Sequence, residues 1–334
     1  MAAGTRILMV STESSERPKL IIHVGSQKTG TTTIQGFLKN STESLSEAGV
    51  HYLNTGRTNI AHNIMIKMIR NGRGPGMAKR MIKEMGRNRG KTCVISSEMF
   101  FRPDMADYFA KYFPQDLRAH SKVVVYLRRQ DKFAEAMWKQ RVKNGRYTGT
   151  PMDYLSQNKN LNYLPTLNYY ADVFGRENLI VRPFERPHFP DGDVLLDFAQ
   201  HCHVPVELAK AYDLPSSNAT LSKEVSEGLG QLNRDKSGIN TRQLIRILSR
   251  LKPEGAIRSG DCYDLETRRD VMAGFAEINE DIRATYCPEL DRLFDTDDLD
   301  DDASYPELNP SVLALHQAQA RAAIDLAIAE LNAD

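Results

Sequence analysis

One stretch of the chain combines a strand, a glycine-framed loop and a helix in immediate succession. The run Ile21-Ile22-His23-Val24 is typical of a short buried strand and ends at Gly25. Gly25 and Gly30 frame the loop, and Ile34 and Phe37 follow it at helical spacing. In such a unit the loop N–H groups and the free N–H groups of the first helical turn converge, and the helix dipole there favours negative charge. The stretch therefore predicts a phosphate-binding loop.

The lysine of this loop departs from the nucleotide-triphosphatase pattern. In G-x-x-x-x-G-K-[ST] the lysine follows the second glycine, whereas Lys28 lies inside the loop and Thr31 follows Gly30. The strand expected at 122–127 runs into Arg128 and not into an acidic residue. A magnesium-dependent triphosphatase would normally need an aspartate at such a strand end. The pattern therefore demands no metal ion.

With these features the chain resembles a known family. The sequence HVGSQKTGTTTIQ, from His23 to Gln35, is similar to the 5′-phosphosulfate loop of sulfotransferases that use 3′-phosphoadenosine 5′-phosphosulfate (PAPS), and further matches follow in the family's order over residues 19–200. Bacterial and carbohydrate-specific members are the most similar. The resemblance implies transfer of a sulfuryl group from PAPS to a hydroxyl or amine, most of all on a carbohydrate or glycolipid, leaving adenosine 3′,5′-bisphosphate.

The resemblance also implies roles for individual residues. Lys28 would hold the 5′-phosphate and neutralise charge on the bridging oxygen as sulfur leaves. Arg128 would bind the 3′-phosphate in bidentate fashion. Glu98, after the strand expected at 91–96, would be the general base that takes the proton of the acceptor hydroxyl. The other implied cofactor-binding residues are Ser26, Gln27, Thr29, Gly30, Thr31 and Thr32.

Some positions depart from the family or leave alternatives open. The family usually has a serine eight residues after the arginine, and this chain has Ala136, so one phosphate contact is missing or comes from elsewhere. His62 opens a helix and is a rival catalytic base, whereas His23 alternates within a strand and is more typical of a core position. The segment 258–260 is loosely similar to a late Arg-Lys-Gly loop of the family, and an exposed turn is the favoured interpretation.

Strands and helices alternate along the first two thirds of the chain. This alternation predicts an α/β fold, with a P-loop-type parallel sheet flanked by helices. Ligands of such sheets bind at the carboxyl ends of the strands, where Gly25, Glu98 and Arg128 are all expected. Beyond residue 205 the pattern is mainly helical. The helices expected after the loop are 31–39, 42–49, 61–70, 77–87, 104–111, 131–144, 165–174, 193–201, 222–233, 241–251, 265–286 and 311–331, and the fourth strand is expected at 178–181.

Four parts of the chain are expected to differ in structure. Residues 1–18 form a flexible N-terminus, and residues 19–290 form the sulfotransferase-like domain. Residues 291–310 are acidic and read as a solvated linker. The last helix, within 311–334, is alanine-rich and packs on the body or on a second subunit of a possible homodimer.

Composition and charge limit the classes of binding partner and the cellular location that we expect for the protein. The chain has 44 basic and 43 acidic residues, so its bulk charge implies no nucleic-acid or membrane partner. Between Arg57 and Lys91, however, ten basic residues stand against one acid; this segment is either a solvated face or a surface that steers an acidic glycan or lipid-linked acceptor. The four cysteines show no paired spacing, and no apolar run approaches the ~20 residues of a membrane span. A cytoplasmic enzyme is therefore expected.

Two other functions remain open from the sequence. One is a nucleotide kinase of related fold, against which the position of Lys28 and the missing strand-end aspartate both argue. The other is a nucleotide-binding or regulatory protein without turnover, and Ala136 is the observation that motivates it.

Overall fold

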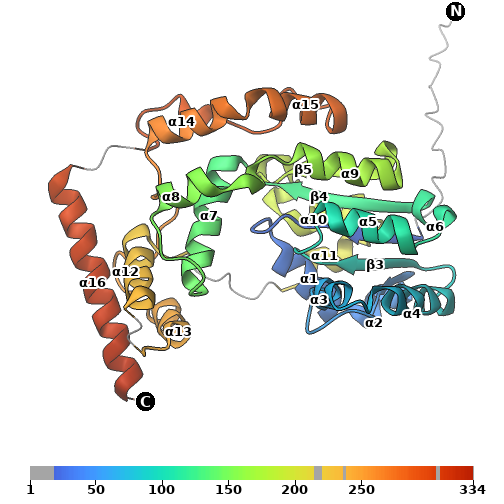
Figure 1. The fold of residues 1–334 in the computed structure, drawn as a ribbon, viewed down its shortest axis with the longest axis horizontal. Helices are drawn as coiled ribbons and strands as arrows, with labels where there is room; N and C mark the ends of the chain where they lie inside the picture. The colour runs from blue at the N-terminus through green and yellow to red at the C-terminus, as the bar shows by residue number, and fades with distance from the viewer. Residues whose placement is uncertain (1–18, 214–219, 236–237, 306–308, 334) are drawn as a thin grey trace, which may run out of the picture.

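A parallel five-stranded sheet forms the centre of the protein, with the strand order β2-β3-β1-β4-β5. The computed structural model describes residues 19–213, 220–235, 238–305 and 309–333, so the N-terminus expected to be flexible lies outside the described residues. The strands are β1 (Leu20–His23), β2 (Val50–Tyr52), β3 (Thr92–Ser96), β4 (Ser121–Leu127) and β5 (Leu179–Pro183). The predicted α/β fold class is confirmed (Figure 1).

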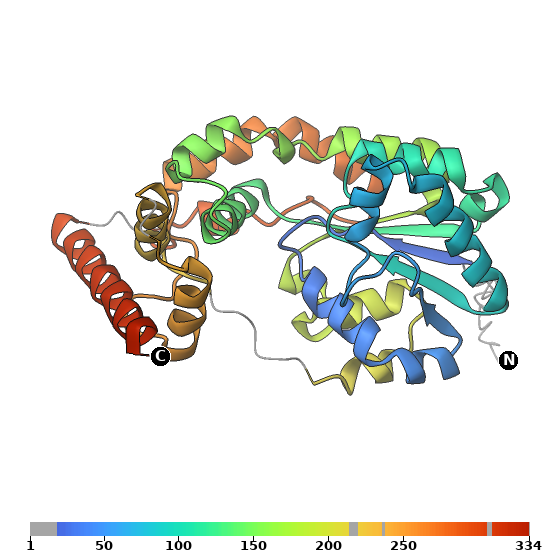
Figure 2. The same cartoon turned by 60° about the horizontal axis from the view of Figure 1, so that its bottom comes forward.

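Helices cover both faces of this sheet because successive side chains of a strand point to opposite sides. Ile22 of β1 packs in a core with α3 (Ile64–Arg70), α4 (Gly74–Arg87), α5 (Pro103–Tyr112), α9 (Leu164–Phe174) and α15 (Ala276–Tyr286). Ile21, its neighbour, packs on the other face with α1 (Thr31–Asn40), α2 (Thr42–Glu47), α10 (Val194–His201) and α11 (Val206–Lys210). Figure 2 shows these two layers from below.

A second, wholly helical core lies beside the sheet, at the left of Figure 1. It contains α7 (Gln130–Lys143), α8 (Pro151–Gln157), α12 (Lys223–Arg234), α13 (Thr241–Leu251) and α16 (Pro310–Ala333). The small buried residues Ala320, Ala323 and Ala327 let α16 pack closely against α12 and α13. The expected C-terminal helix is therefore present and packs on the body of this chain.

Some element boundaries differ from expectation. Helix α4 begins at Gly74, three residues before the helix expected at 77–87, because the proline at position 75 is tolerated in a first helical turn. The single helix expected over 265–286 is two helices, α14 (Leu265–Gly274) and α15, which meet at Phe275. The remaining short elements are α6 (Gln115–Ala119) and the 3-10 turns at 159–161, 176–178, 186–188, 190–192 and 297–299.

The acidic segment expected as a solvated linker is docked on the body over the part that the structure describes. Asp298 accepts hydrogen bonds from the buried guanidinium of Arg129, and the Asp295 carbonyl accepts another at 2.7 Å. The backbone N–H of Asp295 donates to Glu185 at 3.0 Å. These contacts explain the difference, since carboxylates that pair with a buried cation are not free to be solvated. In the described part of the chain, no helix combines the length and the apolarity that crossing a bilayer requires.

Candidate functional site

The glycine-framed loop joins β1 to α1 in a tight, left-handed path. A Cβ atom on Gly25 would lie 2.2 Å from Thr31 Cγ2, so only glycine fits there. Gly30 has φ 71° at the N-cap of α1. Lys28 also has positive φ, at 66°, a backbone conformation that is uncommon and strained for a residue with a side chain. The Thr29 hydroxyl donates to the Ser26 carbonyl at 2.5 Å and closes the loop.

The sheet topology brings the three predicted strand-end residues together. Strands β3 and β4 are the two neighbours of β1, so the loop lies between Glu98 and Arg128. The Thr31 hydroxyl lies 3.4 Å from a Glu98 carboxylate oxygen. On the other side, the Arg128 guanidinium donates to the Lys28 carbonyl at 3.0 Å. The loop therefore has a carboxylate on one flank and a guanidinium on the other.

Helix α7 separates two cavities that meet at this loop. The basic cavity, of about 530 Å³, is lined from the helix by Lys132, Glu135, Ala136, Lys139, Gln140 and Lys143. The aromatic cavity, of about 830 Å³, is lined from the helix by Phe133, Met137 and Arg141. Both sets repeat at three or four residues, which is the spacing of one helical face. Lys28 and Arg128 face the basic cavity, whereas Ser26, Gln27 and Glu98 face the aromatic one.

Three cations of the basic cavity have no acidic partner. Among the described residues, no carboxylate oxygen lies within 4.0 Å of the charged nitrogens of Lys28, Arg128 or Lys143. Burial lowers the pKa of Lys28 to about 8, and repulsion by Lys143 and Arg128 adds to this effect. Burial also lowers the pKa of Arg128 and of Lys143. Three partly buried, mutually repelling cations are the arrangement that an anionic ligand would stabilise.

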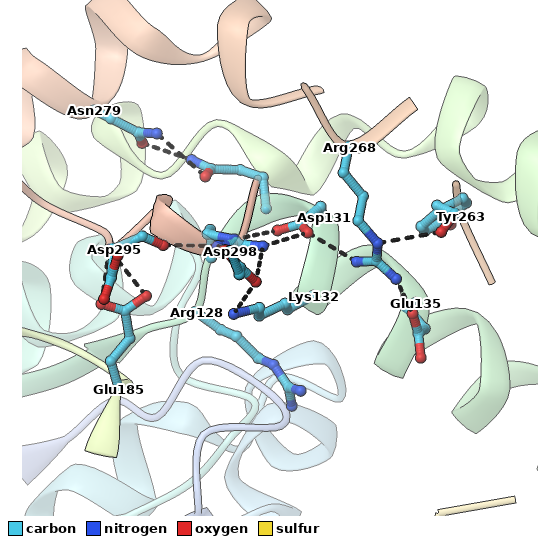
Figure 3. A network of polar contacts seen from close by, with 12 residues as sticks. Arg128, Asp131, Lys132, Glu135, Glu185, Tyr263, Arg268, Asn279, Asp295 and Asp298 are labelled. Carbon is cyan, nitrogen blue, oxygen red and sulfur yellow. Dashed lines mark hydrogen bonds and ion pairs between the residues drawn. The ribbon is translucent and has the colours of Figure 1, made fainter. Parts of the chain in front are cut away.

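The other cations around this cavity belong to a network of ion pairs, shown in Figure 3. Arg268 is buried and binds Asp131 at 2.8 Å and Glu135 at 2.7 Å, and Lys132 lies 3.1 Å from Asp298. In Figure 3 the Arg128 guanidinium points away from this network. The network therefore fixes the walls of the cavity, while the charge of Arg128 stays free for a ligand.

Two carboxylates and a thiol beside the basic cavity lie close enough together to suggest a metal site. Ligand atoms of Glu135, Asp261 and Cys262 lie within 4.8 Å of one another. Lys139 forms ion pairs with both carboxylates, and Arg268 forms another with Glu135. The negative charge of this cluster is thus already matched by cations.

The aromatic cavity has a polar end at the loop and an apolar body. Its apolar lining comes from Met99, Phe101, Phe133, Met137, Tyr154 and Tyr163. Glu98 is half-buried at the polar end, next to Ser26 and Gln27. Such a cavity suits a molecule with an apolar or sugar-like face and a hydroxyl directed at Glu98.

The two histidines considered in the sequence lie away from both cavities. His62 is fully buried, and its Nε2 contacts the Leu53 carbonyl at 3.0 Å while its Nδ1 contacts the backbone of Ser96. Burial lowers its pKa to about 4. His23 is also fully buried, with Nδ1 2.8 Å from the Ser96 hydroxyl. Neither lines a cavity described above, and His62 is therefore left out of the mechanism below.

Of the remaining positions considered in the sequence, some line the basic cavity and others do not. Ala136 lines it, and so do Ser259 and Gly260 of the late loop, whose Gly260 N–H donates to Glu135 at 2.7 Å. Arg258 of that loop instead contacts His316. Thr32, on the first turn of α1, is exposed and lines neither cavity.

Sequence reasoning missed several residues of the basic cavity. Gln140 accepts a hydrogen bond from Lys28 at 2.6 Å, and Lys143 and Tyr305 complete the wall. The spacing of Lys132, Lys139 and Lys143 on one face of the predicted helix was the available signal. Tyr305 gave no such signal, because it lies in the segment 291–310, which has no helical or strand periodicity and was expected to be a solvated linker.

Comparisons with known proteins give few matches. The chain is 29% identical over 198 residues to an uncharacterized protein from Archaeoglobus fulgidus, a match that covers 58% of this chain and 53% of that protein. The chain thus spans about half the length of this curated relative. A crystal structure of a sulfotransferase from Alicyclobacillus acidocaldarius aligns with 86% of this chain and all of that one, at 17% identity and a TM-score of 0.42. No family model matches the sequence.

Proposed function

We propose that the protein is a sulfotransferase that takes a sulfuryl group from PAPS and transfers it to a hydroxyl or amine of an acceptor, of which a carbohydrate or glycolipid is the leading candidate. The observation that carries this proposal is the separation of charged residues between the two cavities on either side of α7. Lys28, Arg128 and Lys143, which have no acidic partner, line the basic cavity. Among the described residues beside the loop, Glu98 is the one acid without a cationic partner, and it lines the aromatic cavity.

The residues of the basic cavity fit the donor. The loop N–H groups and Lys28 would hold its 5′-phosphate, and Arg128 and Lys143 would hold its 3′-phosphate, since guanidinium and ammonium groups favour such oxyanions. The donor supplies an activated sulfuryl group whose bond to the phosphate breaks in the reaction.

The residues of the aromatic cavity fit the acceptor. Glu98 would accept the proton of the attacking hydroxyl as the new oxygen–sulfur bond forms. Lys28 would stabilise the negative charge that develops on the departing phosphate oxygen. The loop lies between the two cavities. The hydroxyl would therefore attack sulfur from the side opposite to the departing phosphate oxygen, as an in-line displacement requires.

A nucleotide kinase is the second candidate, and one contact favours it. The Thr31 hydroxyl and the Glu98 carboxylate, 3.4 Å apart, form a pair of oxygen ligands of the kind that Mg²⁺ prefers beside a phosphate. A third possibility, a nucleotide-binding protein without turnover, is motivated by Ala136.

Thermal unfolding with two nucleotides separates these candidates. We expect adenosine 3′,5′-bisphosphate to raise the unfolding midpoint of the wild type and not of Lys28→Ala, with the exposed α1 variant Lys39→Ala as the matched control. Stabilisation by ATP with Mg²⁺ and none by the bisphosphate would favour the kinase. Stabilisation by PAPS without sulfation of any acceptor in a panel, and with no effect of Glu98→Gln, would favour the silent binding protein.

A further inference from the structure

A face of the molecule formed by α3, α4 and the turn after α4 is densely basic. Eight of its Lys and Arg side chains are exposed: Lys67, Arg70, Arg73, Lys79, Arg80, Lys83, Arg87 and Arg89. Lys79, Lys83 and Arg87 repeat every four residues along α4 and therefore form a line on one side of that helix. The eight residues are called the basic face below.

None of the eight cations of the basic face is neutralised within the described part of the chain, where no carboxylate lies within 4.0 Å of them. The segment 57–91 has a single acid, Glu84, and this carboxylate is already occupied. It accepts hydrogen bonds from the backbone N–H of Asn54 at 2.8 Å and of Thr55 at 2.9 Å, and it contacts His51 at 3.0 Å. The basic face thus keeps its full positive charge.

The charge of the whole molecule is strongly uneven as a result. Ten cations and one acid give the segment 57–91 a net charge of plus nine, whereas the whole chain carries plus one, so the other residues carry minus eight. A molecule with this asymmetry turns its basic face toward any negatively charged surface. The near-neutral total charge hides this property.

The shape and composition of the basic face favour a planar partner. None of its eight residues lines the basic or the aromatic cavity. The exposed large hydrophobic side chains of the described residues all lie outside segment 57–91. The basic face therefore offers no such side chain on which nucleic-acid bases could stack or that could insert into the acyl layer of a membrane. What remains is electrostatic attraction by flexible Lys and Arg side chains, which is how polybasic segments bind acidic lipid headgroups.

We propose that the basic face attaches the protein peripherally to membranes rich in anionic phospholipids. Asn63, just before α3, accepts a hydrogen bond at 2.5 Å from Ser97, the residue before Glu98, so the start of α3 is tied to the strand end that carries Glu98. The proposal stands on the charge and exposure of the face and does not depend on the proposed reaction.

Sedimentation with lipid vesicles tests this proposal. We expect the full chain to bind vesicles of phosphatidylcholine with phosphatidylglycerol, to ignore pure phosphatidylcholine, and to be released as salt rises from about 0.1 to about 0.5 M. The test variant replaces Lys79, Arg80, Lys83 and Arg87 by Gln, and its binding should fall on the order of 1,000-fold. The matched control replaces four exposed cations elsewhere, Lys39, Arg242, Arg246 and Arg321, by Gln, and should bind nearly as the wild type.

Several outcomes would overturn the proposal. Equal loss in the two variants would show that overall charge and not the basic face is responsible. Binding to a soluble sulfated polysaccharide without binding to anionic vesicles would assign the face to a glycan. The Lys28→Ala variant should keep full vesicle binding, so a failure of the proposed reaction and a failure of membrane attachment are distinguishable.

Discussion

The ammonium of Lys28 donates a hydrogen bond of 2.6 Å to the amide oxygen of Gln140, which lies 112 residues later on α7. The partner is neutral, so it holds the lysine in place without cancelling its charge. A carboxylate in the same position would form an ion pair and satisfy Lys28 without any ligand. Gln140 therefore lets the free protein keep a positioned and unneutralised cation beside the loop.

Gln140→Glu should change the pH dependence of bisphosphate binding. In the wild type the affinity should fall as pH rises through about 8, because burial lowers the pKa of Lys28 to that value and the lysine then loses its proton. A new carboxylate favours the protonated form and moves this loss to higher pH, while it competes with the phosphate and weakens affinity at pH 7 by about tenfold. Calorimetric titration between pH 6 and pH 10 measures both effects.

Gln140→Met, which fills similar space without charge, is the control for this pH dependence. It should leave the position of the alkaline loss close to that of the wild type. An unchanged profile in Gln140→Glu would show that Gln140 does not act on Lys28.

Lys28→Met should stabilise the free protein while abolishing bisphosphate binding. The pKa of Lys28 is lowered from 10.5 to about 8 on folding, so the folded state binds fewer protons than the unfolded state between these values. Stability of the wild type should therefore rise with pH across that window, and the variant should lack this rise. At pH 7 we expect its unfolding midpoint to be higher by about 1–4 °C, and calorimetry would contradict the prediction if it were lower.

The sheet and the loop were predictable because both depend on local patterns. Apolar runs such as Val123-Val124-Val125 are strong signals for buried strands, and the glycines at 25 and 30 mark the loop directly. Parallel pairing predicts that Glu98 and Arg128 share the sheet edge of the loop, and the strand order, with β1 between β3 and β4, then puts them on either side of it. The three-residue strand β2 was missed, because Val50–Tyr52 is too short to give a periodic signal.

Local patterns predict only part of the wall of the basic cavity, namely the shared helix face of Lys132, Lys139 and Lys143. Its cations resemble surface lysines in the sequence, and only the fold shows that Lys143 faces Lys28. The acidic run was read as solvated, since charge runs usually are, yet Arg129 is fully buried and needs Asp298 as a partner. Contacts between residues that are 169 positions apart have no signature in one sequence.

Asp298→Ala should destabilise the protein and loosen the wall that Tyr305 forms. The Asp298 carboxylate accepts hydrogen bonds from Arg129 and, at 2.7 Å, from Tyr305, and its loss leaves a buried guanidinium with one partner fewer. We expect a loss of about 2–4 kcal/mol in the free energy of unfolding. Chemical denaturation measures it, and Asp297→Ala, which removes an exposed neighbour, should cost under about 1 kcal/mol.

The same carboxylate should also contribute to acid sensitivity. Burial alone would raise the pKa of Asp298, but the hydrogen bonds from Arg129 and Tyr305 hold it well below the usual range. A lowered pKa contributes stability that is present at neutral pH and is lost as pH falls below about 4. The difference in stability between wild type and Asp298→Ala should therefore shrink on acidification, and a constant difference would contradict this assignment.

Ala136→Ser should strengthen binding of the bisphosphate. Residue 136 lies on the face of α7 that lines the basic cavity, so a hydroxyl there would point toward the ligand phosphates that Arg128 and Lys143 are proposed to hold. A neutral hydrogen bond contributes about 0.5–1.5 kcal/mol, which corresponds to a 2- to 12-fold lower Kd. Calorimetric titration would measure the Kd, and Ala136→Val supplies similar bulk without the hydroxyl. If the serine variant binds no more tightly than the valine variant, the phosphate does not lie against this turn of α7, and the assignment of the 3′-phosphate to this wall is wrong.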